Sequence, residues 1–120
     1  MKIQSFTDLI AWKEAHKLAL MIYRLTDKFP RKEMFSLTDQ MRRCTVSVSS
    51  NIAEGFSRQS KKEKIQFYYT AKGSLTELQN QLLIARDVGY LEKPEFRKVS
   101  EQSILVSKLI TGLIKSVKSR

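Results

Sequence analysis

The stretch Ser60–Val88, SKKEKIQFYYTAKGSLTELQNQLLIARDV, decides the fold because it contains both a helix start and a long apolar stripe. Ser60 and Glu63 fit the capping box, in which each side chain accepts a hydrogen bond from the other residue's free backbone N–H group. The residues that follow on one helical face are Phe67, Ala71, Ser74, Leu75, Leu78, Leu82 and Ala85. At the usual rise per residue the predicted helix is about 40 Å long.

Three breaks divide the chain around this helix. Phe29-Pro30-Arg31 is the first, because proline disfavours helical backbone in the residue before it. The segment from Gly55 to Ser60 is the second. In the third, Gly89 suits the residue after a helix end and Pro94 suits the first turn of a new helix. Further helices are therefore predicted over about Asp8–Lys28, over about Ser36–Phe56 and onward from Pro94, with Thr7 or Asp8 as the N-cap of the first.

Each of these further segments also has an apolar stripe at spacings of three and four residues. The stripes are Ala11, Ala15, Leu18, Ile22, Leu25 and Phe29; Leu37, Met41, Cys44, Val48, Ile52 and Gly55; and Phe96, Val99, Ser103, Val106, Ile110, Leu113 and Val117. Short connections between long helices favour antiparallel neighbours. The sequence therefore predicts an all-α protein, a single domain over residues 1–120 that forms an antiparallel up-and-down four-helix bundle.

The composition agrees with this class and indicates a compartment. Four glycines and two prolines supply too few turn residues for an all-β fold. The start of the chain lacks the apolar run of a signal peptide, and no stretch reaches the ~18 apolar residues of a membrane span. The single cysteine cannot form an internal disulfide, which fits a reducing compartment. We expect a soluble cytoplasmic protein.

Residues that could perform catalysis are scarce. With one histidine, His16, the chain offers neither a two-histidine metal site nor the usual hydrolase triad, and we read this residue as partly buried or interfacial. Cys44 lies in an apolar stripe, so we read it as a packing residue. Glu54 and Glu77 could in principle act as a carboxylate pair, but no base or metal supports that. The expectation is a protein that is not an enzyme and binds no metal or cofactor.

A polar seam follows the apolar stripe of the predicted second and third helices. Its members are predicted to form a structural polar network: Arg43, Asn51, Glu54 and Glu77. A pairing of Arg42 or Arg43 with Glu77 would place opposite charges across the two helices. Three interpretations stay open, namely a buried network that determines helix register, a subunit interface and an anion-binding surface.

The formal net charge of +10 favours a nucleic acid or an anionic membrane as partner. A membrane is the weaker candidate, because the apolar faces are needed inside the bundle. The basic residues gather in two clusters, Arg58, Lys61, Lys62 and Lys64, and Lys115, Lys118 and Arg120. The first cluster surrounds the N-terminus of the predicted third helix, and a helix N-terminus itself attracts anions. Tyr68 and Tyr69 follow in the same helix and could stack on bases if exposed. The alternative is a solvated face that only keeps the protein soluble.

Several motifs resemble the family of four-helix proteins encoded in intervening sequences of bacterial 23S rRNA genes, also labelled S23 ribosomal proteins. The core of the resemblance is Asp39-Gln40-Met41-Arg42-Arg43 followed by Asn51-Ile52-Ala53-Glu54-Gly55-Phe56. Asp8-Leu9 with Trp12-Lys13 is similar to the opening of that family, and Ala71-Lys72-Gly73-Ser74-Leu75 to its third helix. The resemblance extends over nearly the whole chain.

The resemblance implies a ring-shaped homo-oligomer, with a pentamer favoured, as in the related accessory variability determinant protein of diversity-generating retroelements. That relative is basic, binds nucleic acid and has a reverse transcriptase as its partner. By analogy Arg42 and Arg43 join the basic clusters, and the predicted nucleic-acid-binding residues are Arg42, Arg43, Arg58, Lys61, Lys62, Lys64, Lys115 and Lys118. The functional hypothesis is a non-catalytic accessory protein that binds RNA or DNA. The alternative is an oligomeric scaffold that docks a protein partner and has no nucleic-acid role.

Overall fold

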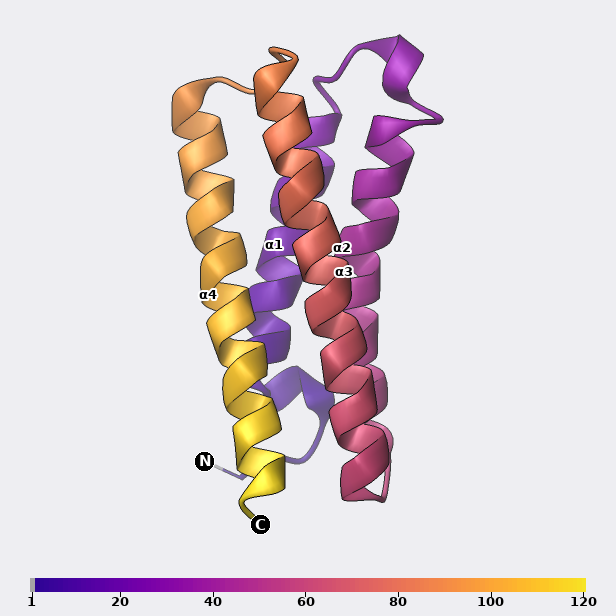
Figure 1. Ribbon diagram of the computed structural model, residues 1–120, viewed down its shortest axis with the longest axis vertical. Coiled ribbons are helices and arrows are strands. Elements are labelled where there is room, and N and C mark those ends of the chain that lie inside the picture. Colours follow the sequence, from indigo (N-terminus) through magenta and orange to yellow (C-terminus); the bar gives the residue numbers. More distant parts are fainter. Residues whose placement is uncertain (1) are drawn as a thin grey trace.

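The computed structural model describes residues 2–120, which form an antiparallel up-and-down bundle of four long helices (Figure 1). The helices are α1 (Ile10–Thr26), α2 (Leu37–Ser57), α3 (Lys61–Asp87) and α4 (Lys93–Lys118), and two short 3₁₀ helices, η1 (Phe6–Asp8) and η2 (Arg31–Glu33), precede α1 and α2. No strand occurs within these residues. The predicted fold class is confirmed. The particle measures 46 × 25 × 20 Å, so its two ends are well separated surfaces.

The core forms where the four apolar stripes meet along the bundle axis. Each helix packs against two neighbours, because α1 and α3 both contact α2 and α4. Side chains with essentially no exposed surface come from every helix: Leu18, Ile22, Met41, Val48, Ile52, Leu75, Leu78, Leu82, Val106 and Ile110. Burying these side chains is the main source of stability, since each contributes roughly 1.5–3 kcal/mol of hydrophobic free energy. No helix within residues 2–120 is long and apolar enough to cross a bilayer.

The start of the first helix differs from the prediction. The N-cap of α1 is Leu9, which provides no capping side chain, and not Thr7 or Asp8; Ser5 caps the preceding η1. The Asp8 carboxylate accepts hydrogen bonds from the backbone N–H groups of Gln4 and Ser5 at 3.0 and 3.1 Å, and these bonds lower the pKa of Asp8. Because Leu9 then takes an extended conformation, α1 begins only at Ile10.

The starts of α3 and α4 both rely on N-terminal capping. Ser60 Oγ accepts a hydrogen bond from the backbone N–H of Glu63 at 3.1 Å, which is half of the capping box predicted there. At α4 a capping box that the sequence analysis did not predict joins Glu92 and Glu95, and Pro94 lies in the first turn as predicted. These caps satisfy N–H groups that have no partner inside the helix.

The α3–α4 turn is held against the α1–α2 turn at one end of the bundle. Gly89 has φ +88°, and the N–H groups of Gly89 and Tyr90 donate to carbonyls of the last turn of α3, which is the Schellman arrangement. The Tyr90 ring lies 5.3 Å from the ring of Phe29, and its hydroxyl donates to Glu33 at 2.7 Å. The opposite end contains the α2–α3 turn and both chain ends (Figure 1).

Candidate nucleic-acid interface

The two basic clusters, which are far apart in the sequence, lie at the same end of the bundle. Lys61 and Lys62 begin α3, and Lys115 and Lys118 end α4. Because α4 runs antiparallel to α3, its last turns return to the first turns of α3 (Figure 1). We call this surface the basic end and define it as Arg58, Lys61, Lys62, Lys64, Lys115, Lys118 and Arg120.

One direct contact joins the two clusters, and a second joins α4 to α3 beside them. Lys61 Nζ donates to the main-chain carbonyl of Arg120, and Lys118 Nζ donates to the Tyr69 hydroxyl at 3.1 Å. Lys62 and Lys115 are exposed side chains on the same two helices. The bundle therefore creates one basic surface from residues that the sequence presents as two clusters.

Lys64 has a structural role within the basic end. Its ammonium donates to the carbonyls of Phe56 and Gly55, at 2.7 and 3.4 Å, and so satisfies the last carbonyls of α2. Burial, followed by the nearby Arg120, lowers the pKa of Lys64. Lys64 therefore holds the α2–α3 turn together and is less free than Lys61 or Lys62 to meet a ligand.

Aromatic rings accompany the cations of this end. Arg58 lies 4.7 Å from the ring centroid of Phe67, and Lys118 lies 5.5 Å from that of Tyr69. Tyr69 is 47% exposed, whereas Tyr68 is 2% exposed and belongs to the core. Of the two tyrosines considered for stacking, only Tyr69 presents a ring to solvent.

Acidic side chains that neutralise basic ones lie mainly at the end of the bundle opposite the basic end. The ion pairs near the α1–α2 and α3–α4 turns are Lys28–Glu95, Arg42–Asp27, Arg43–Asp39 and Arg86–Asp87. At the basic end, the described residues contain one ion pair, between Arg58 and Glu54 at 3.0 Å. After Glu101 the sequence has no acidic side chain, so the last turns of α4 contribute only positive charge.

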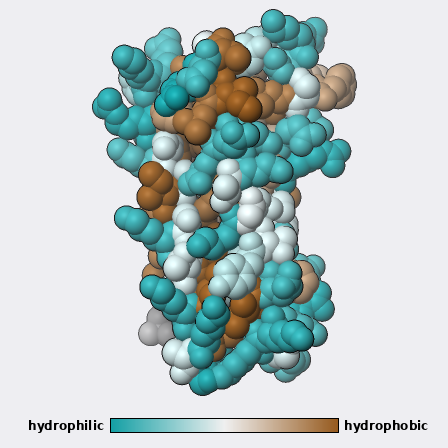
Figure 2. Space-filling view, viewed as in Figure 1, coloured by the Kyte–Doolittle hydropathy of each residue, from teal (hydrophilic) through white to brown (hydrophobic). Residues whose placement is uncertain are grey.

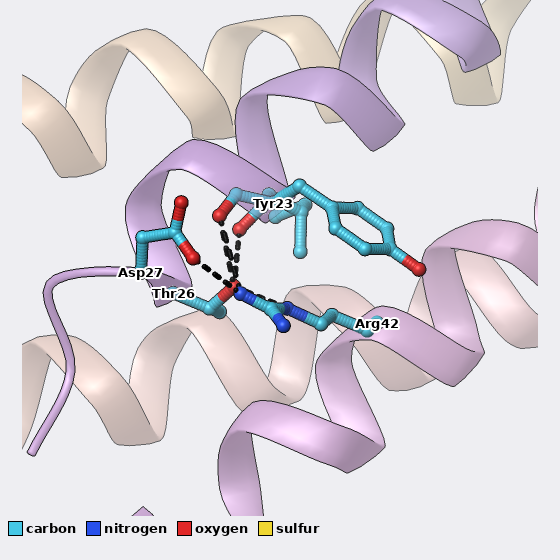
Figure 3. A network of polar contacts seen from close by, with 5 residues as sticks. Tyr23, Thr26, Asp27 and Arg42 are labelled. Atoms are coloured by element: carbon cyan, nitrogen blue, oxygen red, sulfur yellow. Dashed lines mark hydrogen bonds and ion pairs between the residues drawn. The ribbon is translucent and has the colours of Figure 1, made fainter. Parts of the chain in front are cut away.

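Arg42 lies away from the basic end and holds α1 against α2 (Figure 3). Its guanidinium donates to Thr26 Oγ1 and to Asp27 Oδ1, both at 2.9 Å, and to the carbonyl of Tyr23 at 3.4 Å. It also lies 4.8 Å from the ring centroid of Tyr23. These bonds satisfy groups at the C-terminus of α1, where a cation is favourable. Arg42 thus interacts with the protein itself.

Arg43 is also separated from the basic end. It is exposed and donates to Asp39 one turn earlier on α2, at 3.0 Å. From Arg43 to Arg58 the helix rises by roughly 22 Å. The structure therefore groups six of the eight predicted nucleic-acid-binding residues and leaves Arg42 and Arg43 outside that group.

The predicted structural polar network does not form among residues 2–120. Neither Arg42 nor Arg43 pairs with Glu77, because each has an acidic partner nearer at hand. Glu54 pairs with Arg58, and Glu77 accepts a hydrogen bond from the Cys44 thiol at 2.6 Å.

Short side chains make the α2–α3 seam instead. Ser47 and Ser74 share a hydrogen bond of 2.8 Å between their hydroxyls, and Asn51 Nδ2 donates to the Ser47 carbonyl at 2.8 Å. Because serine is small, the two helices can approach closely at this level.

Neither His16 nor Cys44 lies in a reactive setting. His16 is exposed and not partly buried, which leaves the interfacial reading as an expectation, and it stacks on Trp12 with ring centroids 4.8 Å apart. Cys44 is buried, and burial together with the hydrogen bond to Glu77 raises the pKa of its thiol to about 11. Residues 2–120 hold no group of three or more histidine, cysteine or acidic side chains arranged to bind a metal ion.

Sequence reasoning missed several polar contacts between helices. Gln102 is buried and donates to both the carbonyl and the carboxylate of Glu14, at 2.9 and 3.0 Å, which ties α4 to α1. Gln79 donates to Ser103 at 3.2 Å between α3 and α4. The sequence indicates such a contact only by a glutamine inside or beside an apolar stripe. It does not indicate the partner of that glutamine, because the partner depends on which helices become neighbours.

The fold and the basic end together define the class of protein, which is a small four-helix bundle with one basic end. The chain belongs to the 23S rRNA-intervening sequence protein family, whose model matches residues 7–112. It is similar in structure to a protein of unknown function from the S23 ribosomal protein family of Bacteroides thetaiotaomicron VPI-5482. The two share 20% sequence identity at a TM-score of 0.82, over 88% of this chain and 96% of that one. Among curated proteins, none matches the chain.

Proposed function

We propose that this protein is a non-catalytic, nucleic-acid-binding accessory protein of the cytoplasm that works as a homo-oligomer. The observation that supports the proposal is the union of two basic clusters into one surface through the contacts of Lys61 with Arg120 and of Lys118 with Tyr69. A concentrated set of cations binds a phosphate backbone by releasing condensed counterions.

RNA is the favoured polymer. The exposed Tyr69 ring lies beside Lys118, so an unpaired base could stack on the ring while its phosphate meets the ammonium. Unpaired bases are most common in the loops and bulges of structured RNA. The α3 N-terminus adds free N–H groups and a partial positive charge to the same surface.

The test is an anisotropy titration of labelled structured RNA and of duplex DNA at several salt concentrations. The test variant is Lys61→Glu/Lys62→Glu, which reverses two exposed charges at the basic end. Its matched control is Lys93→Glu/Arg97→Glu, which makes the same change in net charge at the opposite end of the bundle. We expect wild-type binding to persist near physiological salt, the test variant to lose at least about tenfold in affinity, and the control to lose much less.

Two outcomes would contradict the proposal. Equal losses in the test variant and the control would mean that overall charge, and not the basic end, attracts the polymer. No binding by the wild-type protein beyond low salt would favour the alternative, an oligomeric scaffold that docks a protein partner. A reverse transcriptase is the first such partner to examine, because the family resemblance of the sequence implies a relative, the accessory protein of retroelements, that has such a partner.

Self-association, with a pentamer favoured, is the second part of the proposal. The face between α1 and α2 supports it, because Tyr23 and Val46 are 42% and 43% exposed beside Arg42. We expect light scattering to give a mass several times 13.9 kDa for the wild type, and Val46→Asp to lower that mass. A monomeric wild-type protein at micromolar concentration would exclude the oligomer.

A further inference from the structure

An open groove of about 600 Å³ runs between α1 and α4, away from the basic end. Its apolar lining includes Leu20, Met21 and Leu25 from α1 and Val99 and Leu105 from α4. Leu20 is 43% exposed and Leu105 is 40% exposed, although both lie on helices with well-buried stripes elsewhere. Figure 2 faces α3 and α4 and shows brown apolar side chains on that face too, so exposed apolar residues also occur outside this groove.

The rim of the groove is positively charged. Lys17, Arg24 and Lys28 line the α1 side, and Lys98 lines the α4 side with Glu95 and Glu101. Lys28 and Glu95 pair with each other at 3.0 Å across the groove. Apart from this pair, the rim has three cations, Lys17, Arg24 and Lys98, and one carboxylate, Glu101. The surface therefore combines an apolar floor with a basic rim.

The dimensions match a short helix. From Lys17 to Lys28 the α1 side extends over roughly 16 Å, which equals about three turns of helix. An amphipathic helix commonly binds such a groove by laying its apolar face on the floor. We propose that the α1–α4 groove binds an amphipathic helix of about three turns from another protein, with leucine-like residues on Leu20 and Leu105 and acidic side chains facing the rim.

A second copy of this chain does not supply that helix. None of α1 to α4 has more acidic than basic side chains, so each would bring no excess of negative charge to the basic rim. Charge complementarity therefore selects a different, acidic partner, since like charges brought together across an interface are costly.

The experiment uses a fluorescein-labelled synthetic peptide of about 14 residues, with leucines at positions i, i+3, i+4 and i+7 and glutamates on both flanks. A matched peptide has the same composition in an order that breaks the leucine stripe. Fluorescence anisotropy near 150 mM salt measures the affinity of both peptides for the full-length protein. We expect saturable binding of the striped peptide, at least about tenfold tighter than that of the permuted one.

Variants then locate the binding surface. Leu105→Asp places a carboxylate in the floor, so we expect at least about a tenfold loss for the striped peptide. The control, Ile84→Asp, changes a residue of α3 that is 44% exposed and lies outside the groove, and it should keep the wild-type affinity. Lys61→Glu/Lys62→Glu should also keep it, which separates this site from the basic end. Lys17→Glu/Lys98→Glu tests the rim if Leu105→Asp does not fold.

Three results would overturn the proposal. They are equal binding of the two peptides, loss of binding in the Lys61→Glu/Lys62→Glu protein, and a change of oligomeric mass in the Leu105→Asp protein. The second would mean that the peptide acts as a polyanion on the basic end. The third would mean that the groove is a self-association surface.

Discussion

Gly55 lies inside α2 at the level where the Tyr68 ring of α3 passes closest to it. A β-carbon built at this position would lie 2.6 Å from Cε1 of Tyr68 and 3.1 Å from Cβ of Phe67. Tyr68 is buried, so its ring can shift only by displacing its core neighbours. The glycine is therefore needed for close packing of the two helices, although glycine normally weakens a helix interior.

We predict that Gly55→Ala destabilises the protein by about 1–2 kcal/mol, because the cost of overpacking exceeds the gain in helix propensity. Gly112→Ala is the matched control. It also lies inside a helix but has no atom within 4 Å of the added carbon, so it should stabilise by about 0.5–1 kcal/mol. Urea unfolding followed by circular dichroism measures both values. A Gly55→Ala protein as stable as the wild type would show that α2 and α3 pack less tightly than described.

Cys44 gives a prediction with a defined pH dependence. Burial and the Glu77 hydrogen bond favour the protonated thiol and raise its pKa from 9.0 to about 11. Near pH 8 the native protein should therefore react with iodoacetamide roughly 100-fold more slowly than the urea-unfolded chain. The rate should rise with pH until about pH 11. The same shift adds stability that is complete below pH 9 and is lost as the pH rises to 11. Equal native and unfolded rates at pH 8 would contradict the buried thiol.

The helices themselves are joined by a few specific polar contacts, of which Arg42 is the clearest example. It lies on α2, and its guanidinium donates to the hydroxyl of Thr26 and to the carbonyl of Tyr23 in the last turn of α1. Thr26 is buried and donates its own hydroxyl to the Ile22 carbonyl at 2.7 Å. The first two helices are thus linked at the point where the chain turns between them.

We predict that Arg42→Ala lowers the free energy of unfolding by about 1–2 kcal/mol, because it removes the hydrogen bond to the partly buried Thr26 hydroxyl and the contact of the guanidinium with the Tyr23 ring. Arg43→Ala should change it by no more than about 0.5 kcal/mol, since the Arg43–Asp39 pair is exposed. Neither change touches the basic end, so RNA affinity should stay close to the wild-type value in both. Denaturant unfolding and the anisotropy titration test the two statements. A large loss of RNA affinity in Arg43→Ala alone would assign that residue to the interface.

For the whole molecule, the important feature is that the antiparallel topology places the end of α4 beside the start of α3. Basic residues near position 60 and near position 117 become one surface, while acidic partners gather at the far end. The molecule is therefore polarised in charge along its 46 Å length. A polyanion would meet that end first.

If the basic end acts as one surface, Lys115→Glu/Lys118→Glu should weaken RNA binding about as much as Lys61→Glu/Lys62→Glu does. Each variant should also reduce the slope of log affinity against log salt by about 2, because each lost phosphate contact removes about 1. Titration of both variants over a salt series measures these slopes. A normal slope for the Lys115→Glu/Lys118→Glu protein would restrict the interface to the start of α3.

Much of this architecture could be predicted from the residues alone. The apolar stripes, the Ser60 cap, the breaks at Pro30 and Gly89 and the excess of basic charge are local patterns, because helix periodicity and capping depend on neighbours in the chain. These patterns were sufficient for the fold class and for the two basic clusters. They also placed Cys44 in the core, where the structure has it.

Tertiary structure alone decided which distant residues meet. Lys61 and Lys118 belong to one surface only because α4 returns to the start of α3, and Arg42 turns inward only because α1 ends beside it. The expected pairing of Arg42 or Arg43 with Glu77 does not form. Arg42 meets Asp27 at the end of α1, which depends on the tertiary structure, whereas Arg43 pairs with Asp39 one turn earlier on its own helix, a local pattern that the sequence already contained. Periodicity gives the face on which a side chain lies, but not the azimuth at which two helices dock. Packing of the core determines that angle, and with it every polar partner across the bundle.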